Sequence, residues 1–129
     1  MASYSTPRIK TFLAEGDLSA KQYFFVGIGS NEKQIAVCSG SGAKSIGILM
    51  NKPSAAGQAA EVAIVGGGAL LKLAGSVTAM KYLCTDANGK GLVASSAGDH
   101  VGAFAMDDGV SGDLMAVEVV CMEAQGSDV

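Results

Sequence analysis

The segment CSGSGAKS, residues 38–45, combines glycines, a lysine and a serine in the manner of a phosphate-binding loop. Such a loop follows the pattern G-x-x-x-x-G-K-[ST], because its backbone N–H groups wrap the phosphates and the lysine follows the last glycine. In this chain Cys38 occupies the first glycine position and Ala43 precedes Lys44. No long helical pattern follows to direct an N-terminal dipole at an anion. We therefore interpret residues 38–45 as a hairpin turn between two strands.

The segment ASSAGDH, residues 94–100, brings a serine, an aspartate and the only histidine of the chain close together. A nucleophile elbow requires G-x-S-x-G, and Ala94 stands where its first glycine belongs. The members of a catalytic triad also converge in space and are seldom adjacent in sequence. The pair Asp99 and His100 is therefore interpreted as a solvated turn, with Ser96 beside it.

Asp107, Asp108 and Asp113 are close enough in sequence to raise the question of a calcium site. A calcium loop of the EF-hand type needs D-x-D-x-D-G spacing and a bidentate glutamate at its twelfth position, and neither is present. We interpret the three aspartates as a polar turn. No C-x-x-C pair supports zinc, so we expect no metal ion and no cofactor.

The aromatic run Tyr23, Phe24 and Phe25 could provide a stacking platform for nucleic-acid bases. Only Lys21 lies next to it, and the chain has a net charge of −3 without any basic block. Binding to phosphates requires clustered lysines and arginines, so direct nucleic-acid binding is disfavoured. These rings are expected to pack in a core or an interface. Since each candidate motif fails on its own spacing, we expect no catalytic residue and no enzymatic activity.

The composition indicates a small β-rich domain. The 129 residues are 49% apolar but only 5% aromatic, and 18 of them are glycine. That glycine share is about twice the usual value of roughly 7%, which is typical of many tight turns between short strands. No apolar run approaches the length of about 18 residues that a membrane span needs. The N-terminus lacks the apolar region of a signal peptide, so we do not expect it to be one.

Short apolar runs separated by turn residues predict an all-β domain, a barrel or a sandwich. The strongest hairpin signal is Asn88-Gly89. We expect a polar N-terminal arm over residues 1–11, a β domain over 12–122 and a polar tail over 123–129. Short helical turns near 17–22 and 76–81 remain open. The expected strands cover residues 21–28, 34–39, 45–51, 61–65, 69–73, 80–85, 91–95, 100–106 and 114–122.

Two parts of the chain resemble each other, so an internal duplication is a hypothesis. Residues 14–25 align with 73–84, which matches Tyr23 with Tyr82, and residues 47–65 align with 102–120, which matches Gly47 with Gly102. The halves would be 14–65 and 73–120, two copies of a β-unit of about fifty residues that cover each other's edges. Many matches are glycine, alanine or valine, so chance similarity is the alternative.

The three cysteines, Cys38, Cys84 and Cys121, are odd in number, widely spaced and flanked by apolar residues. A cysteine in such a setting acts as a small hydrophobic side chain, and unpaired cysteines persist in a reducing compartment. We therefore expect all three to be buried thiols.

From about Gly47 onward the chain resembles the small head decoration, or capsid cement, proteins of tailed phages. The resemblance rests on IGILMNKPSAAGQAAEVAIVGG, LAGSVTAMKYLCTDANGKGLVAS and SGDLMAVEVV. It implies a β-tulip or β-barrel domain, usually a homotrimer, on the outer capsid surface around local threefold positions. There the protein would bind the major capsid protein and stabilise the head by tying neighbouring subunits together. It also implies no catalytic residue and no cofactor.

The polar N-terminal arm is where we expect the capsid contact, because arms of this kind often carry such contacts. The candidate residues are Tyr4, Pro7, Arg8, Lys10 and Phe12.

Two other functions remain as alternatives. A carbohydrate- or host-surface-binding β-domain would need exposed aromatic rings with Asp and Asn around them, whereas the chain has three Tyr and no Trp. A small β-barrel enzyme would need polar groups that converge in a cavity, and the single histidine has no matched partner in the sequence.

Overall fold

The computed structural model describes residues 6–31 and 33–124, and these residues form ten strands and no helix. The all-β prediction is therefore confirmed. Accordingly, no described segment is a helix that could cross a membrane. The strands are β1 (Ile9–Ala14), β2 (Phe25–Ile28), β3 (Gln34–Val37), β4 (Gly47–Leu49), β5 (Ala59–Ala63), β6 (Gly68–Lys72), β7 (Tyr82–Thr85), β8 (Gly91–Val93), β9 (His100–Ala105) and β10 (Leu114–Glu123).

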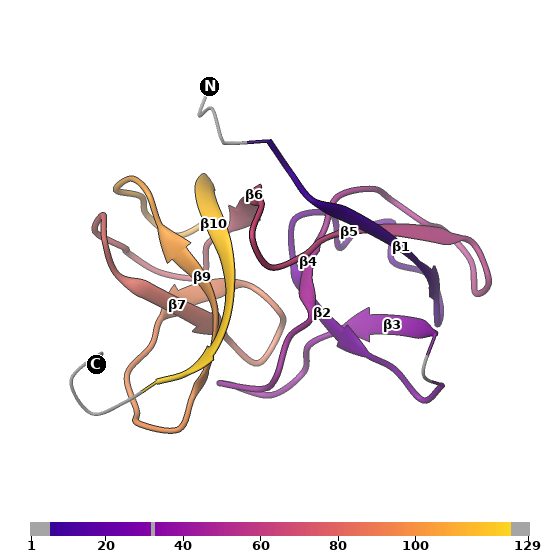
Figure 1. Cartoon of the computed structure of the whole chain (residues 1–129), viewed down its shortest axis with the longest axis horizontal. Helices are drawn as coiled ribbons and strands as arrows, with labels where there is room; N and C mark the ends of the chain where they lie inside the picture. The colour runs from indigo at the N-terminus through magenta and orange to yellow at the C-terminus, as the bar shows by residue number, and fades with distance from the viewer. Residues whose placement is uncertain (1–5, 32, 125–129) are drawn as a thin grey trace.

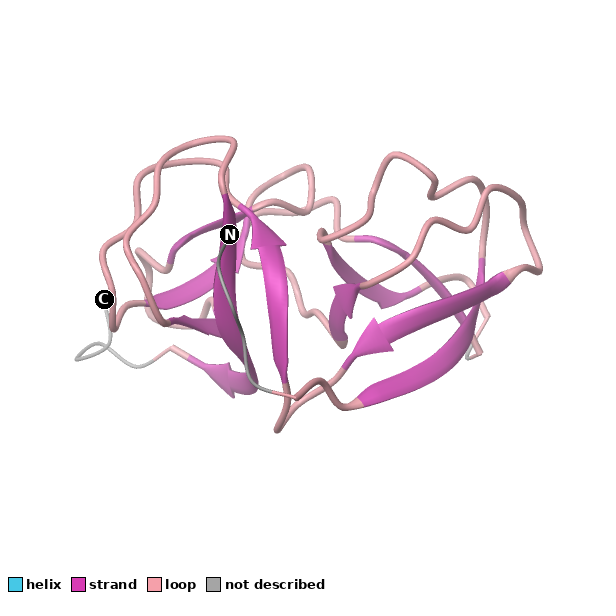
Figure 2. Ribbon diagram, turned by 90° about the horizontal axis from the view of Figure 1, so that it is seen from above, coloured by secondary structure: helices cyan, strands magenta, loops and turns pink. Residues whose placement is uncertain are grey.

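The ten strands form two units that lie side by side (Figures 1 and 2). Strands β1 to β5 close into a barrel in the order β1-β3-β2-β4-β5, and β5 returns to pair with β1. Strands β6 to β10 form a five-stranded sheet in the order β6-β10-β9-β7-β8. The sequence left a barrel or a sandwich open, and the structure combines a closed barrel with a second unit, a five-stranded sheet.

The two units have the same strand order. Starting from its first strand, the barrel runs β1-β5-β4-β2-β3 and the second unit runs β6-β10-β9-β7-β8. The parallel contact of Ala14 with Ile35, which closes the barrel, has its counterpart in a single parallel bridge between Leu73 and Gly91. A duplicated β-unit predicts this agreement in order and direction.

The register shows which residues correspond. Phe25 pairs with Ile48 in the barrel, and Tyr82 pairs with Phe104 at the same point of the second unit. In this register Phe25 corresponds to Tyr82, so the alignment of Tyr23 with Tyr82 was wrong by two residues.

The expected N-terminal arm is shorter than residues 1–11. Residues 9–11 belong to β1, where Ile9 pairs with Ala63 and Thr11 with Glu61 of β5. At the other end, β10 runs through Glu123, and Ala124 is buried and donates its N–H to the Asp99 carbonyl at 2.8 Å. Residues 125–129 of the predicted tail lie outside the described residues. Both boundaries were misplaced because polar residues at strand ends resemble loops in sequence.

The segment 38–45 is not a hairpin turn. Strands β3 and β4, which it connects, do not pair with each other, because β2 lies between them and pairs with both. The loop instead rests on the second unit: the Gly42 N–H donates to the Thr85 carbonyl at 2.9 Å, and the His100 N–H donates to the Gly42 carbonyl at 3.1 Å. Through these backbone hydrogen bonds, residues 38–45 connect the barrel to the second unit.

The Asn88-Gly89 hairpin is confirmed. Strands β7 and β8 pair in antiparallel register on either side of it. One carboxylate oxygen of Asp86 accepts the N–H groups of Asn88 and Lys90, both at 2.8 Å, and Gly89 has a φ of +90°. Glycine adopts this left-handed conformation without steric cost, which is why it occurs at such turns.

Strand β2 contributes to two cores because its side chains alternate between opposite faces. Val26 lies in the barrel core, whereas Phe25 joins a central core that contains residues of both units. A Cβ atom on Gly102 of β9 would approach the Phe25 ring to 2.6 Å, so the ring lies directly against the backbone of the second unit. Phe25 therefore links the packing of the two units.

The glycine-rich junction between the units, Gly66-Gly67-Gly68, is a turn held by hydrogen bonds to β10. The Gly66 N–H donates to the Val119 carbonyl at 3.1 Å, and the Val119 N–H donates to the Gly67 carbonyl at 2.8 Å. A Cβ atom on Gly67 would collide with the backbone of Arg8. Glycine is required here because the chain before β1 crosses the junction at close range.

Candidate functional site

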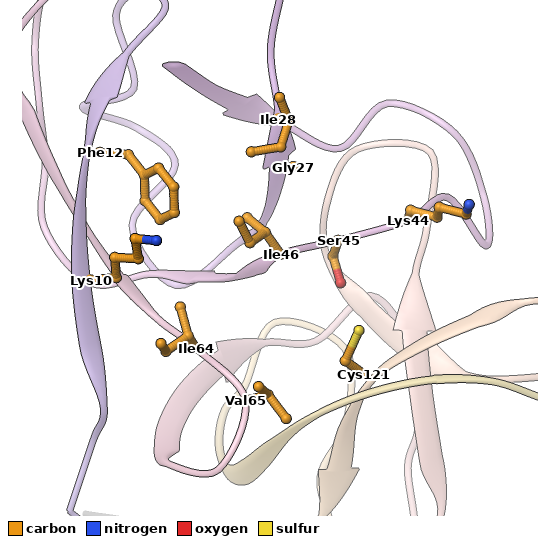
Figure 3. A pocket seen from close by; sticks show the side chains of 10 residues that line it. All are labelled: Lys10, Phe12, Gly27, Ile28, Lys44, Ser45, Ile46, Ile64, Val65 and Cys121. Carbon is orange, nitrogen blue, oxygen red and sulfur yellow. The ribbon is translucent and has the colours of Figure 1, made fainter. Parts of the chain in front are cut away.

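An apolar groove of about 550 Å³ opens at one end of the barrel (Figure 3). Phe12, Ile46 and Ile64 pack on the barrel core with one side and line the groove with the other. Ile28 and Val65 complete the apolar lining and are 51% and 49% exposed. A volume of this size falls within the roughly 300–1,000 Å³ typical of binding pockets, and barrel mouths are frequent locations for them.

Strand alternation explains why these side chains meet at the mouth. Along β1, Lys10 and Phe12 project to the same side as Ala14, which is buried in the barrel core. Along β2, Ile28 projects to the same side as the buried Val26. These side chains therefore continue the barrel interior to its open end, where no further layer covers them.

The rim of the groove is cationic. Lys10 and Lys44 line it, and no carboxylate does so among the residues that the structure describes. The Lys10 ammonium nitrogen lies 5.5 Å from the centre of the Phe12 ring, a distance that favours a cation–π contact. Cys121 of β10 faces the groove from the second unit. The groove thus offers an apolar floor and positive charge at its edge.

The structure separates the residues that the sequence suggested for a capsid contact. Lys10 and Phe12 both line the groove. Arg8 is exposed beside the junction, where one guanidinium N–H donates to the Val65 carbonyl at 3.4 Å, and Pro7 is half-buried nearby. Tyr4 lies outside the described residues. That these residues contact a capsid stays a prediction.

Sequence reasoning missed most of the groove. Ile28, Ile46, Ile64, Val65 and Cys121 come from the ends of several strands that are far apart in sequence. The available signal was an apolar residue at a strand end directly before a glycine turn, as in Ile28-Gly29 and Val65-Gly66.

The cysteines divide into two kinds. Cys38 and Cys84 are buried as predicted, and burial raises the pKa of each thiol to about 11. Cys121 is exposed, so the prediction of a third buried thiol was wrong. Cys121 lies where the pairing of β10 with β9 shifts register, between Val119 and Met122, and its side chain faces the groove.

In the segment 94–100, the side chain of Asp99 has a structural role and that of His100 is partly buried. One carboxylate oxygen of Asp99 accepts the backbone N–H groups of Ser95 at 3.4 Å and Ser96 at 3.2 Å, so this carboxylate organises its own turn. The His100 Nε2 atom is buried and has no hydrogen-bond partner among the described residues. Burial lowers the pKa of His100, the positive charge of Lys44 adds to this effect, and a hydrogen bond with the Ser45 backbone opposes it.

This environment predicts a pH-dependent stability. Because the folded state lowers the pKa of His100, the unfolded chain binds more protons, and stability falls as the pH drops through the ordinary histidine value. We expect the melting temperature to decrease between about pH 7.5 and about pH 5, a window that spans the unperturbed histidine pKa of about 6.5. The H100F variant should lose most of this decrease in a thermal melt monitored by circular dichroism. An equal decrease in both proteins would contradict the assignment to His100.

The three aspartates of the supposed calcium site bind backbone N–H groups. Asp108 accepts the Ala79 N–H at 2.8 Å, Asp113 accepts the Val110 N–H at 3.0 Å, and Asp107 accepts the Asp108 N–H at 2.8 Å. No group of metal-binding side chains occurs among the described residues. The aspartates fix the shape of the connection between β9 and β10.

Comparison with known proteins gives a similarity of fold. No family model and no curated protein matches the sequence. Among solved structures, the chain is similar to the N base of the head fiber gp8.5 of bacteriophage phi29. The match covers 92% of this chain and 98% of that chain, with a TM-score of 0.68 and 11% sequence identity. At this identity the similarity establishes a shared fold over nearly the whole of both chains.

Proposed function

We propose that the chain is a structural virion protein that attaches to the outer surface of a phage head and stabilises it by bridging subunits of the major capsid protein. The observation that carries this proposal is the fold shared with the base of a phage head fiber over 92% of the chain. The sequence resemblance to head decoration proteins supports the same role. The protein would be made in the host cytoplasm and act without catalysis or cofactor.

The outward face of β1 is the surface that suits attachment to the head. Ile9 and Leu13 are each 43% exposed on this face, and Arg8 and Lys33 lie beside them as exposed cations. Backbone groups of β1 are already paired with β3 and β5, so the contact would be made by side chains. In a homotrimer, three such faces would engage neighbouring capsid subunits together, and their linkage would strengthen a weak single contact.

Phage particles assembled with and without the gene for this chain are compared to test this function. We expect the chain in purified heads, antibody label on the head surface in electron micrographs, and earlier DNA release on heating when the gene is deleted. Purified protein added to heads that lack it should bind to them and restore their resistance to DNA release on heating. Label confined to the tail, or heads that neither contain nor bind the chain, would overturn the proposal.

A variant of the β1 face tests the attachment surface. The I9D/L13D protein should bind heads at least about tenfold more weakly, since each aspartate must be desolvated in an apolar contact. Its melting temperature should stay close to that of the parent chain because both side chains project from the surface. A55D, an exposed change in the turn before β5, is the matched control and should bind normally. Normal binding by I9D/L13D would exclude this face.

The carbohydrate-binding alternative gains no support from the groove. Its lining contains a single aromatic ring, that of Phe12, and neither an aspartate nor an asparagine. Protein sites for sugars combine several such groups, so the groove is better suited to an apolar partner. A glycan array that shows no specific binding would agree with this conclusion.

A further inference from the structure

We propose that the groove binds a second copy of this chain, through the connection between β9 and β10 of that copy. This connection together with the first residue of β10, residues 106–114, is called the acidic loop here. The inference rests on the proposed function, because the contact would join several copies of the chain on one head. The contact itself is argued from the charges and exposed side chains of the two surfaces.

The charges of the two surfaces are opposite. The acidic loop contains Asp107, Asp108 and Asp113 and no lysine, arginine or histidine. Within the described part of the chain, the groove is lined by Lys10 and Lys44 and by no carboxylate. Opposite charges at the rim of a contact speed the encounter, fix the orientation and exclude wrong partners.

Both surfaces also have an apolar centre. In the acidic loop Met106, Val110 and Leu114 are 54%, 57% and 43% exposed. Met80, which is 76% exposed, lies next to the loop, since its N–H donates to the Ala105 carbonyl at 2.8 Å. An apolar centre within a polar rim is the usual anatomy of a specific protein interface. The groove, with Ile28 and Val65 half-exposed, is the concave counterpart.

The acidic loop is ordered before it binds. Gly109 and Val77 form a bridge in which each N–H donates to the other's carbonyl at 2.9 Å. Asp108 holds the Ala79 N–H and Asp113 holds the Val110 N–H, as described above. A loop that is fixed in advance loses little conformational entropy on association.

The loop cannot occupy the groove of its own chain. Strand β10 begins at Leu114, at the end of the acidic loop, and Cys121 of the same strand lines the groove. Seven residues of extended strand span roughly 23 Å at about 3.3 Å per residue. The contact is therefore head-to-tail between copies, and such contacts close into a ring when the rotation between copies permits.

Two variants and their mixture test the contact in solution. K10E/K44E changes two lysines that line the groove, and D107K/V110K changes exposed positions of the loop that do not hold the Val77–Gly109 bridge. By native mass spectrometry at low salt, the parent chain should self-associate and each variant should be monomeric. An equimolar mixture should form heterodimers and nothing larger, because one intact groove and one intact loop remain.

Cys121 provides a second readout. As the exposed thiol within the groove, it should react with a maleimide about tenfold more slowly in the associated parent than in D107K/V110K, in proportion to the bound fraction of grooves. Cys38 and Cys84 are buried, and burial keeps their thiols protonated, so both should stay slow in every protein. Melting curves of both variants establish that they are folded.

A monomeric parent chain, variants that associate like the parent, or a mixture that yields no heterodimer would each overturn the proposal. Head binding separates this failure from failure of the proposed function. The I9D/L13D protein should still self-associate while it no longer binds heads. If K10E/K44E loses head binding although the parent is monomeric, the groove takes a capsid segment and the second-copy proposal is wrong.

Discussion

Replacing Phe25 with alanine is expected to lower the free energy of unfolding by about 3–5 kcal/mol, the usual cost of removing a buried phenylalanine ring. The ring is fully buried in the central core, where it packs together with side chains of both units. It also lies against Gly102, whose missing side chain makes room for it. Its loss would leave a cavity between the units that neither unit can fill alone. Both units should therefore unfold at a lower denaturant concentration in a single transition.

F12A is the matched control for this prediction. The same ring is removed, but Phe12 is only half-buried and one side of it already faces the groove. The loss of stability in urea titrations should be less than half that of F25A. Equal losses would mean that Phe25 does not connect the units, and a biphasic F25A transition would mean that the units fold separately.

Local turn chemistry explains why the strands could be predicted from the sequence. At Asn88-Gly89, the glycine conformation and the Asp86 side chain determine the hairpin within five residues. Pairing across longer connections depends on the whole sheet. Residues 38–45 resemble a hairpin turn in sequence, yet they connect two strands that lie on either side of β2. The sequence of the loop alone does not indicate that a third strand lies between the two it connects.

The duplication hypothesis matched two glycines that are required for different structural reasons. Gly47 and Gly102 were matched in sequence, but Gly47 pairs with Val26 at the position where Ala103 pairs with Leu83. A side chain on Gly47 would collide with the Ala63 carbonyl, whereas one on Gly102 would meet the Phe25 ring. The similarity of the two units lies in their strand order. Gly47 and Gly102 do not occupy equivalent positions.

The groove was only partly predictable for a related reason. Lys10 and Phe12 were selected because the N-terminal segment is polar, and the structure places both in the groove. In IKTFLA the apolar residues do not alternate, so period-two reasoning could not recognise β1 or assign its faces. The remaining lining residues meet only after the barrel has closed.

Deleting residues 1–11 is expected to lower the free energy of unfolding by at least about 3 kcal/mol, because several backbone hydrogen bonds are lost and each is worth about 1 kcal/mol. Residues 9–11 pair with β5, and the Arg8 carbonyl accepts the Ile64 N–H at 2.8 Å. The deletion would expose the edge of β5 and open the barrel. A lower melting temperature and binding of a dye specific for exposed apolar surface should both be observed.

R8A/K10A is the control that separates folding from attachment. Both side chains are exposed and the backbone of β1 is kept, so its melting temperature should stay close to that of the parent chain. A deletion protein that melts like the full chain would contradict the pairing of β1 with β5. If the deletion does unfold early, weaker head binding by that protein reflects a damaged barrel. Attachment through this part of the chain must then be judged from substitutions that leave β1 paired.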